Sequence, residues 1–218
     1  MLRAILFDMD GLLANSEPLH QKAEKMLFRY LRVDGSELNK KTFGMKAEDA
    51  LEFLKENLKF KQSVETARKF WFDAIRNLFL SGVAPMPFAG ECVDSMKKAG
   101  YPLGLCSSSP GEIVDIGLRS LGLKSYFDVI LSGDDVSRGK PDPEIYLEAS
   151  RRLGIQPAYC IVLEDSPAGA LAALAGGMNC IVVPNHYTAH LKFPSGAYLV
   201  KDLSVVTPDF ISRLFPPE

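Results

Sequence analysis

The chain has few of the residues that build zinc-thiolate sites, disulfide frameworks or membrane spans. Its 218 residues include only four cysteines, three histidines and one tryptophan. Cys92, Cys106, Cys160 and Cys180 are widely spaced without a CxxC pair, so neither a zinc site nor a disulfide framework is indicated. No apolar run approaches the length of a membrane span, and the N-terminal MLRAILFD lacks the features of a secretory signal. We therefore expect a cytoplasmic protein that makes no contact with a membrane.

Neither sign of charge is in large excess. The chain has 25 basic and 27 acidic residues and a formal charge of -2, without the basic excess typical of proteins whose main partner is nucleic acid. Its apolar content of 47% can supply the core of one large domain, or of a domain with a sizeable insertion. We expect a small soluble ligand, no nucleic-acid partner, and a monomer or weak dimer.

Apolar runs alternate with helical patterns from about residue 100 onward. The strand-like runs are YPLGLC, FDVILSG, YCIVLED and CIVVP, and RAILFD near the N-terminus belongs to the same set. Strands that are apolar on both faces and alternate with helices are typical of a parallel sheet covered on each side. The pattern predicts an α/β fold with a Rossmann-like, doubly wound parallel sheet as its core.

The region between the first and second of these strands has a different character. Residues 15–86 contain amphipathic patterns such as PLHQKAEKMLFRYL and VETARKFWFDAIRNLFL, with apolar residues three and four apart. We expect an inserted all-helical domain over 15–86 and an α/β core domain over 1–14 and 87–218. The stripe of Trp71, Phe72 and Phe79 is expected to form the insert's own core.

Polar residues follow several of the predicted strands. Ligands of open parallel sheets bind beyond the carboxyl ends of the strands, so these residues are expected to converge at one edge. A further polar segment, RGKPDPE, stands just ahead of a helix. The candidate residues are Asp8 and Asp10 after the first strand, Ser107, Ser108 and Ser109 after the second, Lys140 in RGKPDPE, and Glu164 with Asp165 after YCIVL.

Four carboxylates at one edge repel one another unless a cation lies among them. Mg²⁺ takes oxygen ligands, commonly from carboxylates, waters and a substrate phosphate. Lys140 would add a second positive charge, and the Ser107 hydroxyl with nearby main-chain N–H groups can donate to anionic oxygens. The sequence therefore predicts a Mg²⁺-dependent phosphate site.

The two aspartates of the first strand end can divide the chemistry. Asp8 directly follows the strand and is suited to attack phosphorus as a nucleophile. Asp10 lies on the following turn and is suited to protonate the leaving alcohol and then to deprotonate water. This division predicts a covalent aspartyl phosphate on Asp8.

The segments FDMDG, LCSSS, GKPDPEIY and VLEDSPAG, in this order, resemble the haloacid dehalogenase (HAD) superfamily of phosphatases and mutases. The resemblance covers residue 2 to about residue 184 and implies that the helical insert is a mobile cap that closes over the substrate. It implies that Asp8 is the nucleophile, Asp10 the general acid/base, and Ser107 and Lys140 the phosphate binders. Glu164, Asp165, Asp8 and the main-chain carbonyl of Asp10 are implied to hold Mg²⁺.

Several residues keep two interpretations. Ser108 contributes only a main-chain N–H to phosphate, or nothing beyond a turn, and Glu164 either ligates the metal or orients the ligands. Glu17 and His20 either contact the substrate or have only a structural role, at the start or on the surface of a helix. Ser16 is expected to be the N-cap of that helix. Lys46, in the cap segment TFGMKAED, contacts the leaving group or is an ordinary loop residue. Residues 185–198 are expected to form a solvated loop.

One departure from the family pattern bears on function. The β-phosphoglucomutase branch has a cap arginine for a second phosphate where this chain has Ala47, which disfavours a mutase. The leading hypothesis is a Mg²⁺-dependent phosphatase acting on a small phosphomonoester, most simply a sugar phosphate. The alternatives are a phosphosugar mutase and, from a different class, a binding module that keeps the fold without turnover.

Overall fold

The computed structural model describes residues 3–39 and 47–215. Within them, a parallel sheet has the strand order β5-β4-β1-β6-β7-β8. Because β1 lies inside the sheet, the chain winds outward in both directions from it, which confirms the predicted doubly wound α/β fold. The strands are β1 (Ala4–Phe7), β4 (Leu103–Cys106), β5 (Val129–Leu131), β6 (Cys160–Glu164), β7 (Asn179–Val182) and β8 (Tyr198–Leu199).

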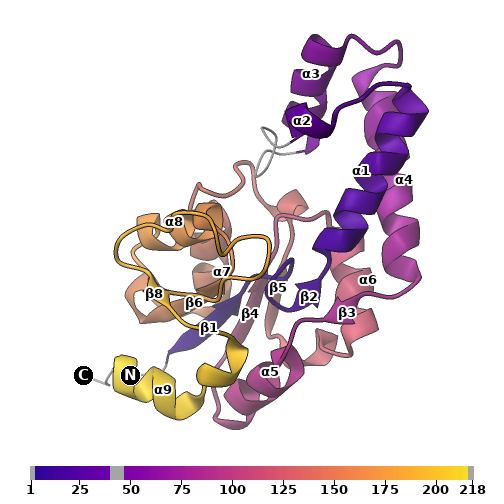
Figure 1. Cartoon of the computed structure of the whole chain (residues 1–218). Coiled ribbons are helices and arrows are strands. Elements are labelled where there is room, and N and C mark those ends of the chain that lie inside the picture. The colour runs from indigo at the N-terminus through magenta and orange to yellow at the C-terminus, as the bar shows by residue number, and fades with distance from the viewer. Residues whose placement is uncertain (1–2, 40–46, 216–218) are drawn as a thin grey trace.

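Helices cover both faces of this sheet (Figure 1). In β1, Ile5 and Phe7 point into the apolar cluster with α5 (Ala89–Lys98), α6 (Gly111–Leu121) and α9 (Pro208–Leu214). Ala4 and Leu6 point into the cluster with α7 (Glu144–Leu153) and α8 (Pro167–Ala175). Alternate residues of a strand face opposite sides, so a strand in the middle of three layers must be apolar throughout. Single 3₁₀ turns complete the core as η1 (Lys124–Tyr126), η2 (Gly133–Asp135), η3 (Pro157–Tyr159) and η4 (Leu203–Val205).

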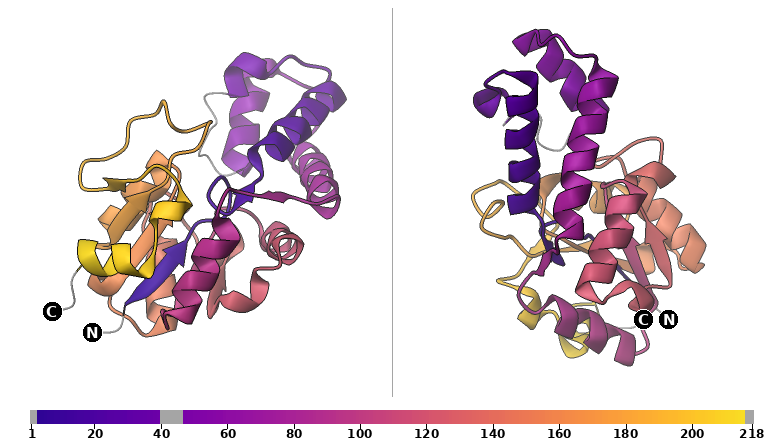
Figure 2. Two further views of the ribbon diagram at one scale, coloured as in Figure 1. Left: turned by 60° about the horizontal axis from the view of Figure 1, so that its bottom comes forward. Right: turned by 90° about the vertical axis from the view of Figure 1, so that its right-hand side faces the viewer.

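The inserted region forms a helical lobe on the side of the sheet where β1 ends (Figures 1 and 2). It comprises α1 (Glu17–Leu31), α2 (Ser36–Asn39), α3 (Ala47–Leu58) and α4 (Val64–Leu80). A two-stranded antiparallel ribbon of β2 (Ala14–Asn15) and β3 (Ala84–Pro85) joins it to the core. The ribbon lies where the sequence places the domain boundaries, and the division itself stays a prediction. Among the described residues, no helix has the length and apolar character that a bilayer span requires.

The helical lobe has two apolar regions. Its outer end has a cluster of its own, made of Leu27, Leu31, Leu51, Leu54, Phe60 and Ala67. At its base, Phe79 is fully buried in the same cluster as Met9 of the α/β core, so the expectation that Phe79 serves only the insert was wrong. Gly117 of α6 lies against both side chains, since a Cβ there would be 3.2 Å from the Met9 sulfur and 3.4 Å from the Phe79 ring. The base of the lobe is thus packed on α6.

Candidate active site

The turn after β1 brings its two aspartates to the edge of the sheet. The Asp8 N–H still donates to the Leu163 carbonyl of β6 at 3.0 Å, so this residue is fixed by the sheet ladder. Gly11 follows with φ +83°, in the left-handed region that favours glycine. A Cβ at Gly11 would also collide with the Asp165 carboxylate and the Asn185 amide. The glycine therefore permits both the turn and the close approach of the acidic residues.

Lys140 lies at the centre of a buried ionic network. Its ammonium donates to Asp8 Oδ1 at 2.6 Å, to Glu164 Oε1 at 2.6 Å and to the Cys106 carbonyl at 3.0 Å. These three bonds use all of its hydrogens, and the residue is only 9% exposed. Burial alone would lower the pKa of Lys140, but the charges of Asp8 and Glu164 outweigh it and hold the pKa above its ordinary value.

The carboxylates around Lys140 carry more negative charge than it can balance. Burial raises the pKa of Asp8 to about 8, with Glu164 and Asp10 adding to the effect and Lys140 opposing it. Burial, followed by the charges of Glu164 and Asp8, raises the pKa of Asp165 well above its ordinary value. Asp8, Glu164 and Asp165 each bring one oxygen within 4.8 Å of the others. Three buried oxygen donors in excess of the local positive charge fit a hard divalent cation such as Mg²⁺.

Glu164 is held where β6 meets α8. Its Oε2 accepts the main-chain N–H groups of Asp165 and Ser166, both at 3.1 Å, and the Ser166 hydroxyl at 2.9 Å. Burial opposes its charge, but the charge and hydrogen bond of Lys140 lower the pKa of Glu164 overall. Glu164 therefore remains a carboxylate and orients Lys140, and its predicted role as a metal ligand stays a prediction.

Asp10 differs from Asp8 in being surrounded mainly by hydrogen-bond donors. Its Oδ1 accepts from Ser16 Oγ at 2.7 Å, and His20 Nε2 lies 3.5 Å away. Its Oδ2 accepts from Ser107 Oγ at 3.1 Å and Ser109 Oγ at 2.8 Å. Burial would raise the pKa of Asp10, but the bonds from His20, Ser16 and Ser109 outweigh it and lower the pKa to about 2.

Two of these partners belong to the helical lobe. Ser16 occupies the predicted N-cap position of α1, but its side chain makes no capping hydrogen bond, and its hydroxyl donates to Asp10 instead. His20, in the first turn of α1, packs against two rings of α4: it stacks on Trp71 with ring centroids 6.3 Å apart and lies edge-on to Phe79 at 5.9 Å. Burial opposes its charge, but the hydrogen bond and charge of Asp10 raise the pKa of His20.

The remaining predicted residues are less closely tied to the site. Glu17 accepts a hydrogen bond from Gln21 on the same helix at 3.2 Å, and its charge helps to raise the pKa of His20. The Ser108 side chain is exposed, and its predicted main-chain role toward phosphate stays a prediction. Lys46 lies outside the described residues.

Asn185 is a site residue that the sequence interpretation missed. Its Nδ2 donates to Asp165 Oδ2 at 2.7 Å and to the Gly11 carbonyl at 3.0 Å. Its Oδ1 accepts the N–H groups of Tyr187 at 2.7 Å and Thr188 at 3.2 Å. The start of the expected solvated loop is thus ordered against the acidic cluster. The signal was available, because Asn185 follows β7 at the same edge where the other polar residues follow their strands.

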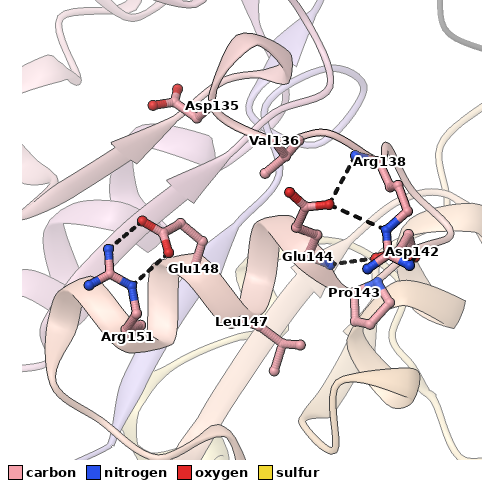
Figure 3. A pocket seen from close by; sticks show the side chains of 9 residues that line it. All are labelled: Asp135, Val136, Arg138, Asp142, Pro143, Glu144, Leu147, Glu148 and Arg151. Carbon is pink, nitrogen blue, oxygen red and sulfur yellow. Dashed lines mark hydrogen bonds and ion pairs between the residues drawn. The ribbon is translucent and has the colours of Figure 1, made fainter.

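A pocket of about 410 Å³ lies away from these residues, on the outer side of α7 (Figure 3). Its Arg138 is paired with Glu144, and its Arg151 with Glu148. Both arginines of the lining are thus already paired with acids and do not offer an anion a free positive charge. The acidic edge, with its unbalanced buried carboxylates, is therefore the better candidate for chemistry.

Three comparisons connect this geometry to known proteins. The family model described as haloacid dehalogenase-like hydrolase matches residues 5–183. A phosphorylated carbohydrates phosphatase from Thermotoga maritima is 34% identical over 181 residues, covering 83% of this chain and 84% of the relative. Hexitol phosphatase B from Escherichia coli is 33% identical over 185 residues, covering 83% of each chain. The crystal structure of CbbY from Rhodobacter sphaeroides in complex with phosphate has a TM-score of 0.87 at 28% identity, covering 97% of this chain and 100% of that one.

Proposed function

Since the chain belongs to the haloacid dehalogenase-like hydrolase family, we propose that it hydrolyses a small phosphorylated carbohydrate through an aspartyl phosphate on Asp8, with Mg²⁺ as cofactor. Family membership confirms the resemblance inferred from the four motifs, and the named phosphatases among the relatives confirm the predicted class of phosphoric monoester hydrolase. Relatives that act on phosphorylated carbohydrates and on hexitol phosphates support the substrate class.

The observation that carries the proposal is the Asp8–Lys140 contact of 2.6 Å inside a buried acidic cluster. Asp8 is fixed by the sheet ladder, so its carboxylate can attack phosphorus without reorganising the backbone. The Lys140 ammonium is already desolvated beside the attacking oxygen and would neutralise charge on the transferring phosphoryl group. Ser107 and the main-chain N–H of Ser108 are proposed to donate to the same phosphate.

Asp10 is proposed as the general acid and base. Its carboxylate is held ionised by hydrogen bonds, and it must be protonated to serve the leaving oxygen. Ser16 and His20 lie at the base of the helical lobe, so a movement of the lobe would weaken their bonds to Asp10 and raise its pKa. Glu17 and Lys46 are proposed to contact the leaving group from the same lobe.

The proposed metal ligands are the side chains of Asp8 and Asp165 with the main-chain carbonyl of Asp10, and Glu164, predicted from the sequence either to ligate the metal or to orient its ligands, is proposed to orient them because protein donors occupy its oxygens. When bound, Mg²⁺ supplies the positive charge that lets these carboxylates and a phosphate dianion share one site. Asn185 orients Asp165 toward the cluster through the 2.7 Å bond to Oδ2. We also propose that the protein is cytoplasmic and that it is a monomer or weak dimer. Size-exclusion chromatography tests the oligomeric state.

The test is phosphate release from hexose phosphates, hexitol phosphates and nucleotides, with and without Mg²⁺. The wild-type protein is expected to release phosphate only with the metal, and Asp8→Asn to lose at least about 10³-fold in kcat. Asp115→Asn, the same change at an exposed ion pair on α6, is the matched control and should keep full activity. Normal turnover by Asp8→Asn contradicts the proposal. Isomerised sugar phosphate in place of free phosphate would indicate a mutase, and no reaction at all would indicate a binding module.

A further inference from the structure

Tyr146 is a fully buried tyrosine on α7 that points into the ionic network. It is 0% exposed, and its hydroxyl donates to Glu164 Oε1 at 2.6 Å. The Lys140 ammonium lies 4.9 Å from the centre of its ring. The next residue, Leu147, lines the outer pocket shown in Figure 3, so α7 presents one face to solvent and Tyr146 to the interior.

The Tyr146 hydroxyl completes the set of hydrogen bonds around Glu164. Oε2 accepts three donors from Asp165 and Ser166, and Oε1 accepts Lys140 together with Tyr146. On another side, a Cβ at Gly169 of α8 would overlap the Glu164 carboxylate. Glu164 is therefore held in one orientation by donors at both oxygens and by the backbone of α8.

This restraint matters because Lys140 is shared between two acids. The ammonium lies 2.6 Å from Asp8 Oδ1 and 2.6 Å from Glu164 Oε1, so a shift of Glu164 would change the position of the ammonium relative to Asp8. The ring of Tyr146 adds a favourable surface for the cation, and its hydroxyl adds a charge-assisted hydrogen bond to the acid. Tyr146 therefore contacts both Glu164 and Lys140.

We propose that Tyr146 is a positioning residue of the phosphoryl-transfer site, whose hydroxyl and ring hold Glu164 and Lys140 so that the ammonium stays on Asp8 and faces the phosphate. This positioning role rests on the proposed function. Its effect on the site can be measured without turnover, because orthovanadate imitates the trigonal phosphoryl group of the transition state and inorganic phosphate imitates the ground state.

The test compares Tyr146→Phe, which removes the hydroxyl and keeps the ring, with Tyr146→Leu, which removes both. In Mg²⁺-loaded protein, Tyr146→Phe is expected to weaken vanadate binding about tenfold and to change phosphate binding less than about twofold. The kcat on the best substrate should fall by the same factor of about ten, with KM almost unchanged. Tyr146→Leu should show a larger loss of both vanadate affinity and kcat.

Ser150→Ala is the matched control. Ser150 lies on the same helix, is 2% exposed, and donates its hydroxyl to the Ile155 carbonyl away from the ionic network. This variant should lower the unfolding temperature and leave vanadate binding unchanged. If Tyr146→Phe behaves in the same way, with an altered unfolding temperature and unaltered vanadate affinity and kcat, the positioning role is overturned. If the wild-type protein itself binds no vanadate, the proposed function fails, whatever Tyr146 does.

Discussion

Asp8 and Asp10 are two positions apart in the sequence, and their side chains face two different regions of the molecule. Asp8 faces the interior, where its partner Lys140 and the neighbouring Glu164 belong to the α/β core. Asp10 faces the helical lobe, and two of its four partners, Ser16 and His20, lie at the start of α1. Burial raises the pKa of Asp8 to about 8, whereas the hydrogen bonds of Asp10 hold its pKa at about 2. The core side of the site, made of Asp8, Lys140 and Glu164, is thus held by the sheet. The lobe side, made of Asp10, Ser16 and His20, depends on the position of the helical lobe.

The largest effect is expected from breaking the core side with Lys140→Met. The substitution leaves the Glu164 carboxylate buried without its cation, which costs about 3–5 kcal/mol of the free energy of unfolding at pH 7. Urea unfolding of both proteins measures the difference. Lys124→Met, which breaks an exposed pair with Asp115, should change stability by less than about 0.5 kcal/mol. A loss below about 1 kcal/mol for Lys140→Met would contradict the assigned burial of the pair.

A second test of the core side is Gly169→Ala. The new methyl group would overlap the Glu164 carboxylate, and we expect a loss of about 1–3 kcal/mol from overpacking. Gly90→Ala is the control, because Gly90 of α5 has open space around it, and alanine in a helix gains about 0.5–1 kcal/mol over glycine. Opposite signs in the two variants, measured by thermal and urea unfolding, are expected. A gain at Gly169 would show that Glu164 does not occupy this position.

The unbalanced charge of the core side predicts a pH-dependent metal affinity. At pH 7 in metal-free protein, Asp8 with its pKa of about 8 is largely protonated, and the raised pKa of Asp165 acts in the same direction. Mg²⁺ must displace these protons, so its affinity should rise from pH 6 to pH 8, about tenfold per pH unit for each proton displaced. Titration calorimetry in buffers of different ionisation enthalpy counts the protons released. An affinity that stays constant over this range would be evidence against a site at Asp8 and Asp165.

The smallest effect is expected on the lobe side, at His20. Its pKa is raised in the folded protein above the ordinary value of 6.5, so the folded state binds the proton more tightly than the unfolded state. This contribution to stability, under about 1 kcal/mol, is fully present below pH 6.5 and is lost as the pH rises through the pKa of the folded protein. His20→Gln keeps a donor toward Asp10 without titrating, so it should flatten this part of the stability profile. An unchanged profile would mean that another group causes the slope.

The agreement between sequence and structure is closest where the signal is local. AILF in β1 is apolar at every position because both faces of the strand are covered, and the polar residues that follow the strands do meet at one edge. Ser16 shows the limit of this reasoning. Its type and position before a helix predict a cap, but the Asp10 carboxylate is a charged acceptor within 2.7 Å and takes the hydroxyl instead. Tyr146 was missed for a related reason, since a pattern along the chain does not say which distant group a side chain will meet.

The sequence by itself determined the α/β core, the helical insert and the positions of the acids, because strand periodicity and strand ends are properties of short segments. Only the tertiary structure decided that Asp8 meets Lys140 across 132 positions of sequence, while Asp10 meets Ser107 across 97. It also decided that the two acids have opposite pKa shifts. Burial and charge depend on every element packed around a carboxylate, and these elements come together only when the sheet and the helical lobe are assembled.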